Sequence, residues 1–163
     1  MEEHEYYMDL ALHEARLAYE KGEVPIGAII VRDGQILARG HNVRELTHQA
    51  TGHAEMMAIA QANEVTGAWR LEGAILYVTL EPCPMCAGAI IMSRIARVVY
   101  GASDLKAGCA GTLMNLLTDE RFNHQAEVIS GIKEKECATL LQDFFKSLRE
   151  RNKARKQQSN LNL

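Results

Sequence analysis

Two short segments hold side chains whose types and spacing suit metal-assisted chemistry: His53-Ala54-Glu55 and Pro82-Cys83-Pro84-Met85-Cys86. Pro84 suits the first turn of a helix, so both cysteine sulfurs can point past the helix start at one ion. The positive end of the helix also favours thiolate over thiol. His53 supplies a third ligand, which leaves the fourth tetrahedral position open for water. An open position is typical of catalytic rather than structural zinc sites.

Glu55 lies two positions after His53, at the expected start of the same helix. If the imidazole reaches the metal, the carboxylate can lie beside the ion without binding it. Zinc lowers the pKa of bound water towards about 7, so a neighbouring carboxylate can take a proton from that water and return it to a substrate. We therefore predict Glu55 as the residue that transfers protons.

A Cys-x-x-Cys pair also occurs in redox proteins and in halves of structural zinc sites. A redox pair has no need of His-x-Glu on the preceding helix, and the sequence contains no second Cys-x-x-Cys. Cys109, in a Gly/Ala segment, and Cys137, on an apolar helix face, are expected to be small buried residues. The histidines without motif spacing are expected at the surface or in local hydrogen bonds; they are His4, His13 and His48.

The length of 163 residues fits one compact domain, which we place at 1–156, with a frayed tail at 157–163. Residues 146–163 hold six basic and one acidic side chain, a net +5, which leaves −8 for the rest of a chain whose net charge is −3. This basic end has two explanations at this stage. It could contact a polyanion, or it could be a solvated helix end whose cations suit the helix dipole.

The first nine residues include four acids and lack the positive start and apolar run of a secretory signal. No stretch approaches the roughly 18–20 apolar residues of a membrane span. We therefore expect a cytoplasmic protein without membrane contact, in which the thiols stay reduced.

Apolar spacing and turn residues predict the elements that must position the motif residues. Helices are expected at 5–21, 53–65, 85–94 and 133–156, and strands at 26–31, 35–39, 74–80, 97–100 and 127–129. Asp33-Gly34 predicts a hairpin turn, and 40–52 and 101–112 are expected as loops. This order predicts an α/β fold, a three-layer α/β/α sandwich with one mixed sheet of about five strands.

The motif pair His-x-Glu and Pro-Cys-x-x-Cys is a known signature of zinc deaminases that act on bases. The chain resembles the bacterial tRNA-specific adenosine deaminases over nearly its whole length. The segments that carry the resemblance are EVPIGAIIV (23–31), HNVREL (41–46), GHAEMMAI (52–59), YVTLEPCPMCAGAI (77–90) and SRIARVVYGASDLKAG (93–108). It implies the cytidine-deaminase-like sandwich, which agrees with the element order above.

The resemblance implies one zinc ion per subunit, held by His53, Cys83 and Cys86, with Glu55 as the catalytic residue. It implies hydrolytic deamination of adenosine to inosine at the wobble position of a tRNA anticodon. In that reaction an activated water attacks C6 of adenine, Glu55 protonates N1 and then the exocyclic nitrogen, and ammonia leaves. An anticodon loop supplies unstacked bases, so the cost of flipping one out is small.

Four further residues match family positions near the substrate: Asn42, the backbone of Ala54, Asp104 and Lys106. The resemblance also implies a homodimer and a tRNA anticodon stem-loop as partner, which makes phosphate contacts by the basic helix end more plausible. The chain departs from the family pattern at Cys109, where the resemblance implies a small residue other than cysteine. This difference alters the wall of the loop slightly and affects none of the catalytic roles.

Two other functions share these features. A deaminase of free bases or nucleotides, such as guanine, cytosine or cytidylate, would have the same metal site, although the basic end and the length of the resemblance favour the tRNA enzymes. A zinc-stabilised RNA-binding module without catalysis would also keep the ligands, but it would not need Glu55.

Overall fold

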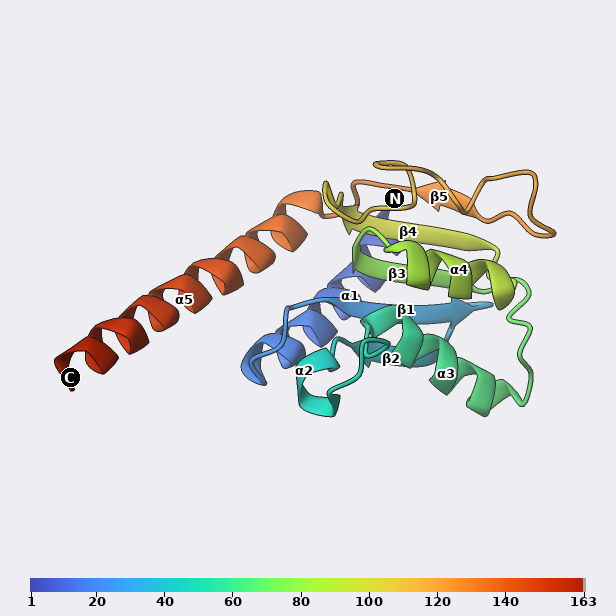
Figure 1. Cartoon of the computed structure of the whole chain (residues 1–163). Helices are drawn as coiled ribbons and strands as arrows, with labels where there is room; N and C mark the ends of the chain where they lie inside the picture. The colour runs from blue at the N-terminus through green and yellow to red at the C-terminus, as the bar shows by residue number, and fades with distance from the viewer. Residues whose placement is uncertain (163) are drawn as a thin grey trace.

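The computed structural model describes residues 1–162 as a sheet between two layers of helices (Figure 1). Its elements, in chain order, are α1 (Glu2–Glu20), β1 (Gly27–Arg32), β2 (Gln35–His41), α2 (Arg44–Thr47), α3 (Ala54–Thr66), β3 (Ile75–Leu80), α4 (Pro84–Met92), β4 (Arg97–Ala102), β5 (Glu127–Ile129) and α5 (Glu134–Leu161). The three-layer α/β/α fold expected from the sequence is confirmed.

The five strands form one mixed sheet in the order β2-β1-β3-β4-β5. Strand β1 is antiparallel to both β2 and β3, whereas β3, β4 and β5 run parallel. Asp33 and Gly34 both have positive φ, 52° and 73°, as a tight turn between β1 and β2 requires. The parallel strands bring the carboxyl ends of β3 and β4 to the same edge, where the site residues follow β3 in sequence.

Each face of the sheet has its own apolar core. Alternate residues of β1 divide between them, with Ile30 facing the α3/α4 layer and Ile29 facing the α1/α5 layer. The α3/α4 core also contains Leu76 and Val98. Helices therefore cover both faces of the sheet. Strands buried on both faces read as continuous β-branched runs, which is why the sequence predicted β1, β3 and β4 so directly.

Gly40 permits a close contact between β2 and the start of α3. A Cβ atom at this position would lie 2.5 Å from the carbonyl oxygen of Ala54 and 2.8 Å from the backbone nitrogen of Ala58. Only a residue without a side chain fits here. The first turn of α3, with His53 at its N-cap, is therefore fixed against the sheet.

Several boundaries differ from the sequence prediction; for example, β2 and β4 each run two residues longer than expected, to His41 and Ala102. Helix α1 begins at Glu2 rather than near residue 5, and the loop predicted at 40–52 contains the four-residue helix α2. Helix α5 continues to Leu161, beyond the expected end at 156, and its exposed second half projects from the body (Figure 1). None of the helices in residues 1–162 combines the length and apolar character that a membrane crossing needs.

Candidate active site

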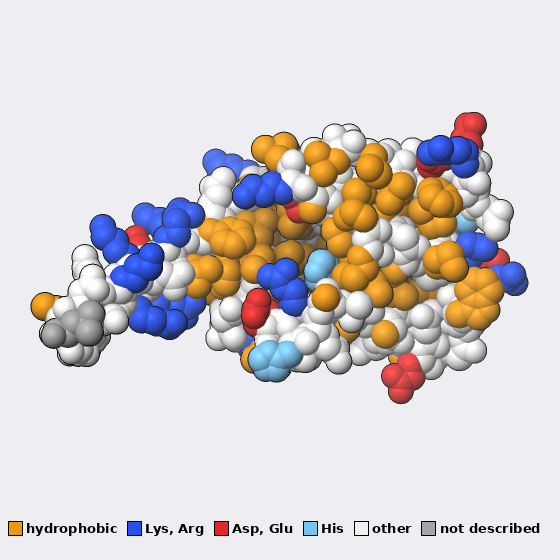
Figure 2. Space-filling view, viewed as in Figure 1, with side chains coloured by type: hydrophobic (Ala, Val, Ile, Leu, Met, Phe, Trp, Pro, Cys, Tyr) orange, Lys and Arg blue, Asp and Glu red, His pale blue; other side chains and the backbone are white. Residues whose placement is uncertain are grey.

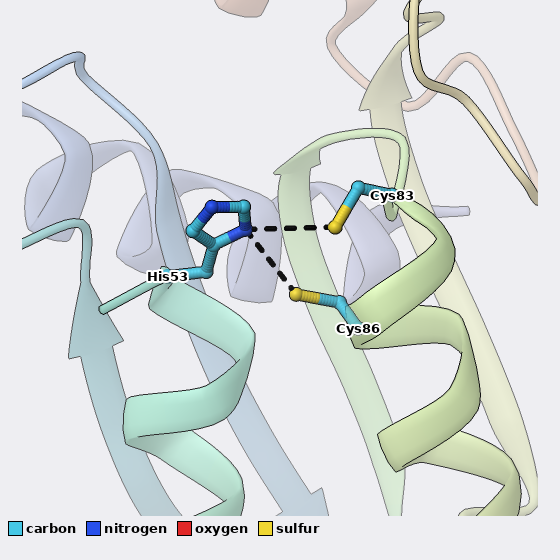
Figure 3. A group of neighbouring side chains, drawn as sticks. All are labelled: His53, Cys83 and Cys86. Carbon is cyan, nitrogen blue, oxygen red and sulfur yellow. Dashed lines mark hydrogen bonds between the residues drawn. The ribbon is translucent and has the colours of Figure 1, made fainter. Parts of the chain in front are cut away.

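The three predicted ligands lie at the starts of two neighbouring helices (Figure 3). His53 is the N-cap of α3 and Cys83 is the N-cap of α4, both with extended backbone, and Cys86 follows in the first turn of α4. Pro84 occupies the first turn of α4, where its missing N–H leaves no bond unmade. Proline also favours the extended conformation of the preceding residue, so it helps to direct Cys83 towards His53.

The donor atoms of these three side chains fit one zinc ion. Nδ1 of His53 lies 3.6 Å from Sγ of Cys83 and 3.5 Å from Sγ of Cys86. Bond lengths of about 2.0 Å to nitrogen and about 2.3 Å to sulfur in a tetrahedron place nitrogen and sulfur about 3.5 Å apart. Within residues 1–162 this is the one group of ligand atoms close enough to share an ion. It contains three residues, which leaves one position for another ligand.

The site favours a thiolate even before a cation is considered. A hydrogen bond from Cys86 and another with His53 lower the pKa of Cys83 to about 4, against the opposing effect of burial. The hydrogen bond with Cys83 raises the pKa of His53, whereas the bond to Cys83 and burial raise the pKa of the Cys86 thiol. In the metal-free protein the negative charge therefore lies on Cys83.

Glu55 lies in the first turn of α3 and is 4% exposed. Burial raises its pKa to about 7, and the negative charge of Cys83 adds to this shift, although the Glu55 backbone hydrogen bond and His53 oppose it. A carboxyl group with a pKa near neutrality can both accept and release a proton at physiological pH. The position and pKa of Glu55 therefore suit proton transfer beside the three ligands.

A cleft of about 750 Å³ opens over these residues. It is lined by six of the eight predicted site residues, namely His53, Glu55, Cys83, Asn42, Asp104 and Lys106. Cys86 is buried below it, and Ala54 is fully buried. One wall follows β2 and includes Asn42, while the opposite wall is the segment 103–107 after β4. The volume suits a ligand with the size of a nucleoside.

Two of the predicted substrate contacts also hold the walls in shape. The side chain of Asn42 donates to the carbonyl of Val24 at 3.3 Å and accepts from the backbone N–H of Arg44 at 3.3 Å. The Asp104 carboxylate accepts from the backbone N–H groups of Lys106 and Ala107 at 3.0 and 3.2 Å. Asp104 therefore stabilises its own turn, and Lys106 follows at an exposed position.

The sequence analysis did not predict that α5 lines the cleft. Leu141, Gln142 and Phe145 reach it from the middle of this helix, and Phe145 remains 41% exposed. Arg44 from α2 is a further lining residue that was missed. The signal available in the sequence was the adjacent pair Phe144 and Phe145, because two consecutive side chains of a helix do not point in the same direction.

Comparison with known proteins agrees with this geometry. The MafB19-like deaminase family model matches residues 2–149. A tRNA-specific adenosine deaminase of Bacillus subtilis (strain 168) is 59% identical over 154 residues, which cover 94% of this chain and 96% of the relative. The chain belongs to the family of tRNA-specific adenosine deaminases.

Solved structures show how widely the family fold is shared. A structure from studies of A-to-I editing by tRNA:A34 deaminases at the wobble position of transfer RNA is 46% identical, with a TM-score of 0.80, and the match covers 83% of this chain and 98% of that one. A guanine deaminase from Bacillus subtilis is 41% identical, with a TM-score of 0.60, over 67% of this chain and 70% of its own. The cytidine-deaminase-like fold is therefore confirmed.

Proposed function

We propose that this protein hydrolyses the adenosine at the wobble position of a tRNA anticodon to inosine. In this reaction one water is consumed, the bond between C6 and the exocyclic nitrogen breaks, a C6 oxygen is gained and one ammonia leaves. The observation that carries the proposal is the convergence of His53, Cys83 and Cys86 beside the buried Glu55, in a chain of the tRNA-specific adenosine deaminase family.

His53, Cys83 and Cys86 are proposed to hold one zinc ion in each subunit. When bound there, zinc would activate a water molecule as the nucleophile of the hydrolysis. The two helix N-termini give the site a positive field that stabilises the thiolates and any negative charge that develops on the substrate. The choice of zinc over other divalent ions rests on the mixed sulfur and nitrogen donor set.

Glu55 is proposed to move the two protons that the reaction requires. Its carboxylate accepts a proton from the attacking water and delivers it to N1 of the adenine ring. The same group then takes the second proton of that water from the oxygen now bonded to C6 and transfers it to the exocyclic nitrogen, so that ammonia rather than an amide ion departs. The buried position of Glu55 limits exchange with bulk water, and in the metal-free protein the pKa of this carboxyl is raised to about 7 by burial, a value that suits a group which both accepts and releases protons.

The target base is proposed to enter the cleft between Asn42 and the segment that holds Asp104 and Lys106, against the backbone of Ala54. Phosphates of the anticodon stem-loop are proposed to contact the projecting half of α5, where Lys and Arg side chains gather (Figure 2). The exposed basic side chains of this part of the helix are Lys146, Arg149, Arg151, Lys153, Arg155 and Lys156. A basic surface beside an open cleft suits a nucleic acid better than a free base.

We further propose that the protein forms a homodimer and acts in the cytoplasm, where its substrate is found. Hydrophobic side chains gather on the face covered by α3 and α4 (Figure 2). The exposed fraction of Met92, which ends α4, is 68%, and those of Leu113 and Met114 are 55% and 54%. A dimer would bury such apolar surface. A molecular mass of one chain, 18.1 kDa, in light scattering at micromolar concentration would contradict the dimer.

Turnover by purified zinc-loaded protein tests the function directly. An anticodon stem-loop with adenosine at the wobble position, guanine and cytidine are incubated separately, and inosine and ammonia are measured. We expect ammonia and inosine in equal amounts from the stem-loop and no release from guanine or cytidine. Turnover of guanine without turnover of the stem-loop would instead indicate the activity of the guanine deaminase relative.

A further inference from the structure

Glu81 carries a buried carboxylate that the proposed chemistry does not use. It follows β3 directly, is 2% exposed and lies two positions before Cys83. Its Oε1 accepts from the backbone N–H of Asp104 at 3.1 Å and from the Thr112 hydroxyl. Its Oε2 accepts from the backbone N–H groups of Ala110 and Thr112 at 3.0 and 3.1 Å.

These four donors occupy the whole accepting capacity of the group, since a carboxylate offers about four lone-pair sites. Glu81 therefore has no free site for a metal, a water or a substrate atom. All four donors come from residues 104–112, which include the segment that lines one wall of the cleft. The carboxylate thus joins the two ends of this segment.

The segment is also shaped closely around the carboxylate. The backbone of Gly108 packs against it so tightly that an added Cβ would overlap the carboxyl carbon and both oxygens. The N–H of the next residue, Cys109, donates to the carbonyl of Pro82 at 2.8 Å, beside the metal ligands. The wall is therefore anchored to the chain that leads from β3 into α4.

We propose that Glu81 is a positioning residue that holds residues 104–112 in the conformation that receives the substrate. It acts on binding affinity through Asp104, Leu105, Lys106 and Ala107, and it takes no part in bond breaking. This inference rests on the proposed function for the identity of the substrate, but the anchoring itself does not depend on that identity.

Glu81→Gln tests the anchor by changing only the acceptor pattern. An amide keeps the shape of the side chain, but in either orientation its NH₂ group would replace an oxygen that accepts two of the four hydrogen bonds. Amide hydrogen exchange at Asp104, Ala110 and Thr112 should become about tenfold faster or more, because these bonds open more often. Exchange in β1 should stay unchanged, and so should the zinc content.

Thr112→Val is the milder variant and folds even if Glu81→Gln does not, because residue 112 is exposed and valine has the same branched shape. It removes one donor to Glu81. Thr66→Val is its matched control, because it removes a hydroxyl bond to the Ala62 carbonyl at the far end of α3. If the receptive conformation falls to about a tenth of the molecules, KM for the stem-loop rises about tenfold while kcat is retained.

The expected pattern is faster exchange in 104–112 together with a raised KM for Thr112→Val, and neither effect for Thr66→Val. Unchanged exchange in Thr112→Val would overturn the anchoring role. Faster exchange with an unchanged KM, or a loss confined to kcat, would overturn the effect on affinity. If the wild-type protein fails to deaminate the stem-loop, the proposed function is wrong. The exchange experiment still tests whether Glu81 holds residues 104–112 in place.

Discussion

The Nδ1 atom of His53 lies 3.5 Å from Sγ of Cys86, although the two residues are 33 positions apart in the sequence. This pair joins the first turns of α3 and α4, which lie on the same face of the sheet. Both helices pack against the sheet, and Gly40 allows the first turn of α3 to lie close to β2, so the two donor atoms are held at ligand distance before an ion binds. A site of this kind should stabilise the protein when it is filled.

Removal of the metal should lower thermal stability. A ligand present at about 1,000 times its Kd contributes about 4 kcal/mol, which corresponds to a loss of roughly 10 °C in Tm for a chain of this size. Cys86→Ala should lose zinc and show the low Tm in every buffer. Cys137→Ala, which removes a buried thiol away from the site, should keep one zinc per chain. Equal zinc content in both variants would contradict the ligand assignment.

Cys83 should be the reactive thiol of the metal-free protein. Its pKa of about 4 lies below that of an ordinary cysteine, so its thiolate forms above pH 4 and persists as the pH falls from 8 to 6. Burial raises the pKa values of Cys109 and Cys137, which keeps them protonated over this range. Iodoacetamide labelling followed by peptide mass analysis should find Cys83 first, and zinc should protect it. Preferential labelling of Cys137 would disprove this.

Glu55→Gln should abolish turnover and leave the fold intact. The amide keeps the shape of the side chain but cannot transfer protons, so kcat should fall by about 10²–10⁴-fold. Zinc content should stay at that of the wild type, and stability should not decrease, because the variant buries a neutral group instead of an ionisable one. Inosine production by Glu55→Gln at a rate near that of the wild type would contradict the proton-transfer role of Glu55.

Charge on the projecting half of α5 should control RNA affinity. Lys153→Glu should weaken binding of the stem-loop and reduce the slope of log K against log salt by roughly 0.7 for each phosphate that the variant no longer neutralises. Lys135→Glu, at the other end of the same helix, is the matched control because both lysines are exposed and the change in charge is equal. Filter binding from about 50 to 200 mM salt measures the slopes. A slope for Lys153→Glu equal to that of the wild type would contradict phosphate contact by the projecting half of α5.

Much of the architecture was predictable because its signals are local. The β-branched runs of β1, β3 and β4, the Asp33-Gly34 turn and the helix start at Pro84 each need only neighbouring residues. The ligand set followed from the same local rules, since His53 and the two cysteines each mark the beginning of a helix. The structure brings these three together as expected.

The features that were missed depend on residues far apart in the sequence. Helix α2 has four residues and no apolar face, and its N–H groups at Glu45 and Leu46 donate to the buried carboxylate of Glu23 at 3.2 and 2.6 Å. Phe145 reaches the cleft because α5 packs against β4 and β3, a placement that helical spacing does not specify. The role of Glu81 likewise appears only once residues 104–112 surround it.

The metal ligands belong to helix starts, whereas the two walls of the cleft are loops fastened by separate buried carboxylates, Glu23 and Glu81. Reactivity and selectivity are therefore encoded in different stretches of backbone. A lineage could exchange one wall for another and recognise a new base without disturbing the atoms that do the chemistry. A guanine deaminase and a tRNA deaminase do share this scaffold.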